Sequence, residues 1–227
     1  MRLDYVPHSL SFEIERESLN FISFENSVHF ENVVFDLHET VSFGEDKVRM
    51  WEDGSIIDLH RTGDIITTPF DVNFDRREIQ KKALEIFSSE LRYCGIEELL
   101  AEINHSLLKM ISETEVMFDF ALEYSESISI NEVLKSVGVR LKEPEGTFIE
   151  RLTEYVHCLH RIGGKSEFFL INCNAYLREG DNTLLEEFAK QEKVDIVQIE
   201  GAVRRAGGEE DGVKVTIIDD DGCELYI

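Results

Sequence analysis

The stretch Phe168-Phe169-Leu170-Ile171-Asn172-Cys173 decides the fold of this chain, because it has the pattern of a short, almost wholly apolar strand. A helical pattern follows from about residue 182 to residue 191, and a second apolar strand covers residues 194–199. A strand, a helix and a strand at this spacing predict a parallel pair joined by a right-handed crossover. We therefore expect an α/β fold with a parallel sheet.

The segments outside this unit extend the same architecture. A helix with a regular apolar stripe over residues 148–159 precedes the first strand. The N-terminal third alternates apolar and polar residues, which is typical of strands, and contains one helical stripe. The strands and the helix expected there cover residues 10–15, 19–24, 28–41, 48–51 and 55–59. Residues 213–218 and 223–227 predict a terminal hairpin, and we expect the loop 204–212 to be mobile.

The middle of the chain is predicted to be helical. Asp75 and Glu78 resemble a capping box that opens a helix over residues 76–92, and a second amphipathic helix follows Gly95. Ser129 and Glu132 form another capping-box signature before a short helix. The expected organisation is an α/β head built from residues 1–62 and 142–227, with a helical leg inserted over residues 63–141.

Composition limits the class of protein. Hydrophobic residues make up 42% of the 227 residues and charged residues 31%, which suits a globular chain with a sizeable core. No apolar run is long enough to cross a bilayer, the N-terminus lacks the layout of a signal peptide, and no two cysteines form a CxxC pair. We therefore expect a cytoplasmic protein.

The formal net charge of -24 has two interpretations. It can give a solvated, soluble surface, and taken alone it argues against nucleic acid as a partner. It can also mean that some carboxylates hold divalent cations. Composition does not choose between them.

Catalytic motifs are weak. Gly163-Gly164-Lys165-Ser166 resembles the end of a phosphate-binding loop, but Leu159 stands where that pattern needs a glycine. The segment also leaves a helix and enters a strand, the reverse of a phosphate loop, so we interpret it as a glycine-terminated helix. His157 and His160 are more consistent with a surface or core pair than with a metal site. We expect no enzyme.

Two groups of charged residues have candidate roles in the leg. Asp119, Glu123 and Glu126 recur at i, i+4 and i+7, which places three carboxylates on one face if the segment is helical. Such a face could bind calcium or simply be solvated. Seven basic residues lie near the two ends of the leg, where a mixed-charge solvated face is the ordinary explanation. They are Arg76, Arg77, Lys81, Lys82, Lys135, Arg140 and Lys142.

Residues 128–139 (ISINEVLKSVGV) closely resemble the Csn2 (Csn-two) family, the adaptation proteins of type II-A CRISPR systems. Residues 168–177 (FFLINCNAYL) resemble that family's central strand, and residues 184–188 and 194–200 its next helix and strand. Residues 70–73 (FDVN) match the family's entry into the leg. The resemblance is clear over about residues 116–200, whereas the first 60 residues depart from it.

The resemblance implies a head related to phosphate-loop ATPases but without their nucleotide site. It also implies a homotetrameric ring with a positively charged central hole for double-stranded DNA ends, stabilised by calcium near the leg. The implied role is non-catalytic DNA-end binding in spacer acquisition, with the CRISPR integrase and the RNA-guided effector nuclease as partners. A degenerate nucleotide-binding protein and an acidic scaffold without DNA affinity stay open as alternatives.

The family resemblance implies roles for some residues more directly than for others. The segment around Glu123, Glu126 and Glu132 corresponds to the family's calcium ligands, and Asp119 is added on helical spacing alone. Lys135 matches a family lysine, and the other six of these basic residues are our own choice for facing DNA. Because the chain is so acidic, we predict that basic residues face the central hole and that acidic residues lie on the outside of the ring or bind metal.

Overall fold

The computed structural model describes residues 1–201, 214–219 and 224–226. The chain divides into two compact units, which we call the head unit (Met1–Asn73 with Pro144–Ile227) and the arm unit (Phe74–Glu143). The expected insertion started earlier, at residue 63. Residues 63–73 belong to the head unit because Gly63–Ile66 form an edge strand of its main sheet. The predicted mobile loop 204–212 lies outside the described residues.

A six-stranded sheet forms the centre of the head unit. Five neighbouring strands of the sheet run parallel to one another, and the sixth, at one edge, pairs antiparallel with its neighbour. From one edge the order is β6 (Gly63–Ile66), β7 (Glu167–Ile171), β8 (Asp195–Glu200), β3 (Leu19–Phe24), β9 (Lys214–Ile218) and β10 (Glu224–Tyr226). The predicted parallel pair is confirmed, with Glu167 opposite Asp195 and Ile171 opposite Ile199. The strands of the terminal hairpin are confirmed too; its turn lies outside the described residues.

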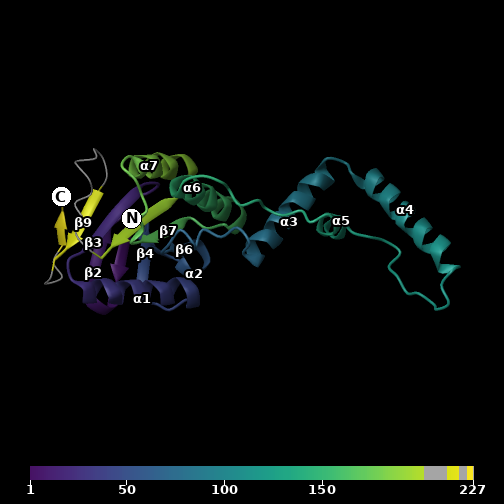
Figure 1. Ribbon diagram of the computed structural model, residues 1–227. Helices are drawn as coiled ribbons and strands as arrows, with labels where there is room; N and C mark the ends of the chain where they lie inside the picture. The colour runs from purple at the N-terminus through teal and green to yellow at the C-terminus, as the bar shows by residue number, and fades with distance from the viewer. Residues whose placement is uncertain (202–213, 220–223, 227) are drawn as a thin grey trace. The chain divides into compact units, whose positions relative to one another are not determined.

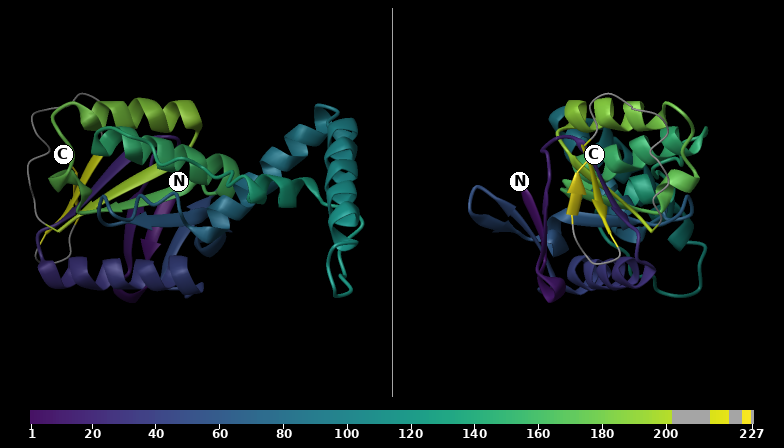
Figure 2. Two further views of the ribbon diagram at one scale, coloured as in Figure 1. Left: turned by 45° about the vertical axis from the view of Figure 1, so that its right-hand side comes forward. Right: turned by 90° about the vertical axis from the view of Figure 1, so that its left-hand side faces the viewer.

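Helices cover both faces of this sheet. On one side lies α1 (Ser27–Phe43), and on the other lie α6 (Phe148–Cys158) and α7 (Asp181–Glu192) (Figures 1 and 2). A sheet buried on both faces needs apolar residues at successive positions. Accordingly Phe168, Phe169 and Leu170 are all fully buried. The mixed α/β class with a parallel sheet is therefore confirmed.

A second, antiparallel sheet packs in the same core. Its strand order is β2 (Leu10–Glu13), β1 (Arg2–Tyr5), β4 (Val48–Glu52) and β5 (Ser55–Ile57). The predicted hairpin around Asp53-Gly54 is confirmed by the pairing of Glu52 with Ser55. The strand β1 was not expected; it is four residues long and is followed at once by a short 3-10 turn, Val6–His8.

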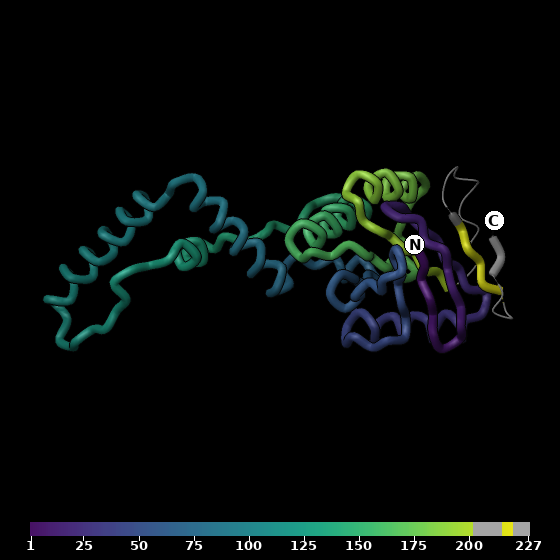
Figure 3. Tube along the Cα trace, turned by 180° about the vertical axis from the view of Figure 1, so that it is seen from behind, coloured from purple at the N-terminus to yellow at the C-terminus, as the bar shows by residue number. Residues whose placement is uncertain are grey.

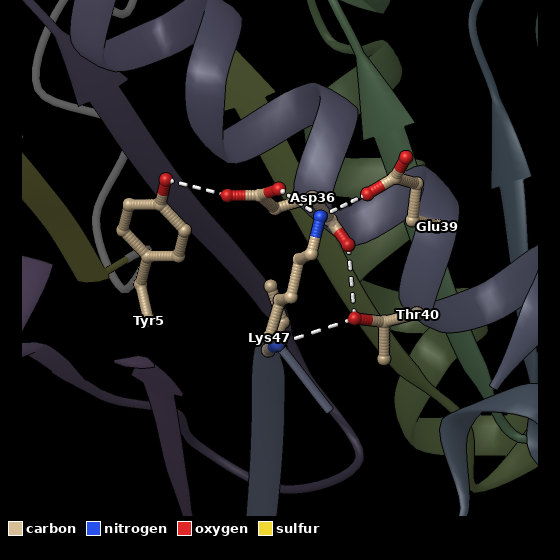
Figure 4. Close-up of polar contacts among 6 residues, drawn as sticks. Tyr5, Asp36, Glu39, Thr40 and Lys47 are labelled. Carbon is tan, nitrogen blue, oxygen red and sulfur yellow. Dashed lines mark hydrogen bonds and ion pairs between the residues drawn. The ribbon is translucent and has the colours of Figure 1, made fainter. Parts of the chain in front are cut away.

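A polar network fastens this small sheet to α1 (Figure 4). The Tyr5 hydroxyl donates to Asp36 Oδ2 at 2.8 Å, and Lys47 pairs with Asp36 at 3.0 Å and with Glu39. Thr40 Oγ1 accepts the Val48 backbone N–H at 3.2 Å. Burial and the bond to Asp36 raise the pKa of Tyr5, so the phenol stays a donor at neutral pH.

The arm unit contains three helices: α3 (Arg77–Tyr93), α4 (Glu97–Glu115) and α5 (Ile130–Ser136). The chain goes out along α3 and α4 and returns through a non-helical segment to α5, which lies beside α3 (Figure 3). The capping box at Ser129 and Glu132 is confirmed. The one at Asp75 and Glu78 is wrong, because the N-cap is Arg76 and makes no side-chain capping bond. A short helix α2 (Leu59–Thr62) belongs to the head unit.

Candidate nucleic-acid interface of the arm unit

One glutamine holds the two ends of the arm unit together. Gln80, in the first turn of α3, donates from Nε2 to the carbonyls of Phe74 at 2.8 Å and Leu141 at 3.3 Å. Its Oε1 accepts the backbone N–H of Leu141 at 2.9 Å. The start of α3 and the chain that follows α5 are therefore fixed side by side.

A groove of about 540 Å³ lies between these two segments. Arg77 and Lys81 are four residues apart on α3, so they share one helical face. Lys135 lies in the last turn of α5, and Arg140 follows the turn after it. The groove therefore gathers four of the seven predicted DNA-facing residues, from segments more than 50 positions apart in the sequence. The residues that line it are Asp75, Arg77, Gln80, Lys81, Leu84, Glu85, Asn131, Lys135, Val139 and Arg140.

The four cations of this arm groove are exposed and only partly compensated. Lys81 lies 3.8 Å from Glu85, an exposed and weak pair. Arg77 and Arg140 form no ion pair within the described part of the arm unit. A guanidinium presents a planar fork of donors that matches a phosphate, so two such groups beside two ammonium groups are suited to a phosphodiester backbone.

The other three predicted residues do not line the arm groove. Arg76, Lys82 and Lys142 each interact with a neighbouring group instead. Arg76 is half-buried as the N-cap of α3. Sequence spacing alone could not separate them from the groove residues, because the separation depends on which side of α3 meets the chain after α5.

The protein-family model described as CRISPR-associated protein (Cas_Csn2) matches residues 45–222. The chain belongs to the Csn2 family of CRISPR-associated proteins. The matched residues include the whole arm unit of this Csn2 chain, whereas β1, β2, β3 and α1 precede them. No curated protein sequence matches the chain. Of the helices in the described ranges, none is both long and apolar enough to span a bilayer.

The expected calcium ligands of this Csn2 chain are not on a common helical face. The helix α4 ends at Glu115, and residues 118–129 have no helical structure. Asp119, Glu123 and Glu126 are all exposed there. The missed signal is a period of two: apolar side chains recur at 118, 120, 122 and 124, which indicates extended backbone. The condition for a shared helical face, a helix over these residues, is therefore not met.

The carboxylate of Glu132 already accepts the capping hydrogen bonds of α5. Its Oε2 accepts both the backbone N–H and the hydroxyl of Ser129, each at 2.7 Å, and these bonds lower the pKa of the carboxyl. Within residues 1–201, 214–219 and 224–226, no group of three or more His, Cys, Asp or Glu side chains could hold a metal ion. The predicted ligands are therefore not gathered into such a group among the described residues, and calcium binding by them stays a prediction.

The segment Gly163–Ser166 ends a helix, as expected. Gly164 is the C-cap, with φ at 71° after a single π-helical turn (Leu159–Gly163), and the Lys165 backbone N–H donates to Leu159 O. Lys165 Nζ donates to His60 O at 3.3 Å. His160 Nδ1 contacts Lys165 O at 2.7 Å, so the whole segment serves as a folded connection into β7.

The connection from β3 to α1 leads from a parallel strand to a helix N-terminus, which is the order of elements in a phosphate-binding loop. Only Glu25 and Asn26 lie between them. Asn26 Oδ1 accepts the backbone N–H groups of Val28 at 2.9 Å and His29 at 3.3 Å. A phosphate would have to displace this cap beside the carboxylate of Glu25. This connection has no glycine-rich cradle for a nucleotide.

Proposed function

We propose that this Csn2 family member is a non-catalytic protein that binds the ends of double-stranded DNA during CRISPR spacer acquisition. Its CRISPR association follows from its family. The observation that carries the DNA-binding proposal is the arm groove, where Arg77, Lys81, Lys135 and Arg140 converge on one face of an otherwise acidic chain.

The proposal includes a homotetramer in which the arm grooves face a central hole. Repeating one groove in every chain multiplies its cations along the DNA, while carboxylates on the outer surface are screened beyond about 8 Å at physiological ionic strength. Each phosphate neutralised releases counterions, which makes binding salt-dependent. The CRISPR integrase and the RNA-guided effector nuclease are the partners within this proposal.

In this proposal, calcium binds between chains of the assembled tetramer. Asp119, Glu123 and Glu126 are exposed but not gathered within one chain, and Glu132 already serves its capping box. A calcium ion takes six to eight oxygen ligands, so here it requires carboxylates from more than one chain.

The proposal treats the head as a relative of phosphate-loop ATPases that has lost nucleotide binding. The parallel sheet with helices on both faces supports the relationship, and the Asn26 cap supports the loss. ATP binding that disappears in Lys165→Ala would contradict this part of the proposal.

The test of DNA-end binding compares linear and closed circular duplexes of one sequence in gel shifts at low salt with calcium. Linear DNA should bind at least about tenfold more tightly, because only an end can enter a closed ring. Equal binding of both forms would contradict end recognition, and no binding of either would contradict the DNA-binding role itself.

A further inference from the structure

A second groove lies on the head unit, between α6 and α7. These two helices pack against each other on one face of the six-stranded sheet (Figures 1 and 2). The groove has a volume of about 470 Å³. The residues that line it are Ile149, Glu150, Thr153, Glu154, His157, Leu184, Glu187, Phe188, Gln191 and Glu192.

The floor of this α6–α7 groove is apolar. Ile149 is buried, Phe188 is half-buried, and Leu184 is 52% exposed beside them. Covering an exposed leucine and a partly exposed aromatic ring with another apolar side chain is favourable, because it removes apolar surface from water. Such a combination is typical of the anchor pocket at the centre of a protein interface.

The walls of the α6–α7 groove are acidic. Glu154 and Glu187 are exposed carboxylates on opposite helices. Glu150 is held by its capping bonds to Thr147, and Glu192 pairs with His157 at 2.8 Å. No lysine or arginine occurs among the described residues that line the groove. The groove therefore presents acidic walls around an apolar floor, and the nearby cations Arg178 and Lys190 lie outside its lining.

We propose that the α6–α7 groove binds a basic amphipathic helix of a protein partner. Apolar side chains of that helix cover Leu184 and Phe188, and its lysine or arginine residues pair with Glu154 and Glu187. The two groove helices have 11 and 12 residues, hence a length of about 16–18 Å, which accommodates about three turns of a docked helix. The proposal is independent of DNA binding and names a separate surface on the head unit.

A labelled peptide of about 14 residues, built from leucine and lysine with one continuous apolar face, tests the proposal by fluorescence anisotropy. Its control is a scrambled peptide of the same composition without that face. The protein variants are Glu154→Lys with Glu187→Lys, and separately Leu184→Ala. The matched control is Glu97→Lys with Glu98→Lys, which changes the net charge equally on exposed positions of the arm unit.

The amphipathic peptide should bind the full chain, and the Glu154 and Glu187 double variant should weaken it by about tenfold or more. Leu184→Ala should weaken it by about three- to tenfold with an unchanged circular dichroism spectrum, while the control variant stays within about twofold of the parent. Equal binding of the scrambled peptide, or an equal loss in both charge variants, would overturn the proposal, because net charge and not the groove would then explain the attraction. No binding of the amphipathic peptide would overturn it as well.

Discussion

Two buried carboxylates lie side by side at the amino-terminal edge of the parallel sheet. Glu167 begins β7 and Asp195 begins β8, and they are opposite each other in the register. Asp195 Oδ1 accepts the Glu17 backbone N–H at 2.7 Å, yet burial raises the pKa of its carboxyl to about 6. Burial also raises the pKa of Glu167. The charge of Asp195 therefore destabilises the folded chain at neutral pH.

Asp195→Asn should stabilise the protein increasingly as pH rises. The folded pKa of Asp195 lies above the unfolded value, so the stability that its protonation contributes is present at low pH and is lost as pH rises through about 6. Asparagine keeps an oxygen for Glu17 and carries no charge. The gain in the free energy of unfolding over the parent should be about 1 kcal/mol larger at about pH 7.5 than at about pH 5, by urea titration. A gain independent of pH would contradict the assignment.

At the scale of the element, the same capping-box pattern was correct at one helix start and wrong at another. At Ser129 and Glu132 both capping bonds form within one turn, whereas α3 begins after Arg76 without a side-chain capping bond. The edge strand β6 was not predictable from a local signal. The strand β6 has four residues, and its strand character depends on pairing with β7, more than 100 positions later in the chain.

The candidate interface was predictable only in part. Resemblance identified Lys135, and the basic pattern of α3 included Arg77 and Lys81. Their meeting with Arg140 depends on the packing of α5 against α3 and on the bonds of Gln80 to Leu141, which are tertiary contacts. The helical spacing of Asp119, Glu123 and Glu126 does not bring them together, because residues 118–129 are not helical, and calcium binding by these residues stays a prediction.

The turn after α5 should be specifically important for DNA binding. Gly138 has φ at 69° and directs the chain to Arg140. Gly138→Ala places a Cβ in left-handed backbone, at a cost of about 1 kcal/mol, and should weaken DNA binding by moving Arg140. Gly95→Ala is the control, because Gly95 has a similar φ of 72° but lies in the turn between α3 and α4. An added Cβ would have no atom within 4 Å at Gly95 or at Gly138. Equal DNA affinity of the two variants would contradict the role of this turn.

At the scale of the whole molecule, assembly is testable without DNA. We expect chains of 26.2 kDa to form a tetramer in calcium and to loosen in chelator, because the described residues of one chain do not gather a set of calcium ligands. Mass measurement by light scattering in both buffers checks this. A tetramer indifferent to chelation would contradict the calcium part of the proposal alone, and a monomer in calcium would contradict the ring.

Because the chain has a net charge of -24, its proposed DNA binding depends on where its cations lie. The most direct measurement is the affinity for linear duplex DNA, as a function of salt, of Lys135→Ala with Arg140→Ala. Its control is Arg92→Ala with Lys109→Ala, which removes the same charge from the arm unit outside the groove. The groove variant should bind at least about tenfold more weakly and lose about 0.9 from the log–log salt slope per phosphate contact, whereas the control keeps both. Equal losses in the two variants, or none in the groove variant, would contradict DNA binding by the arm groove.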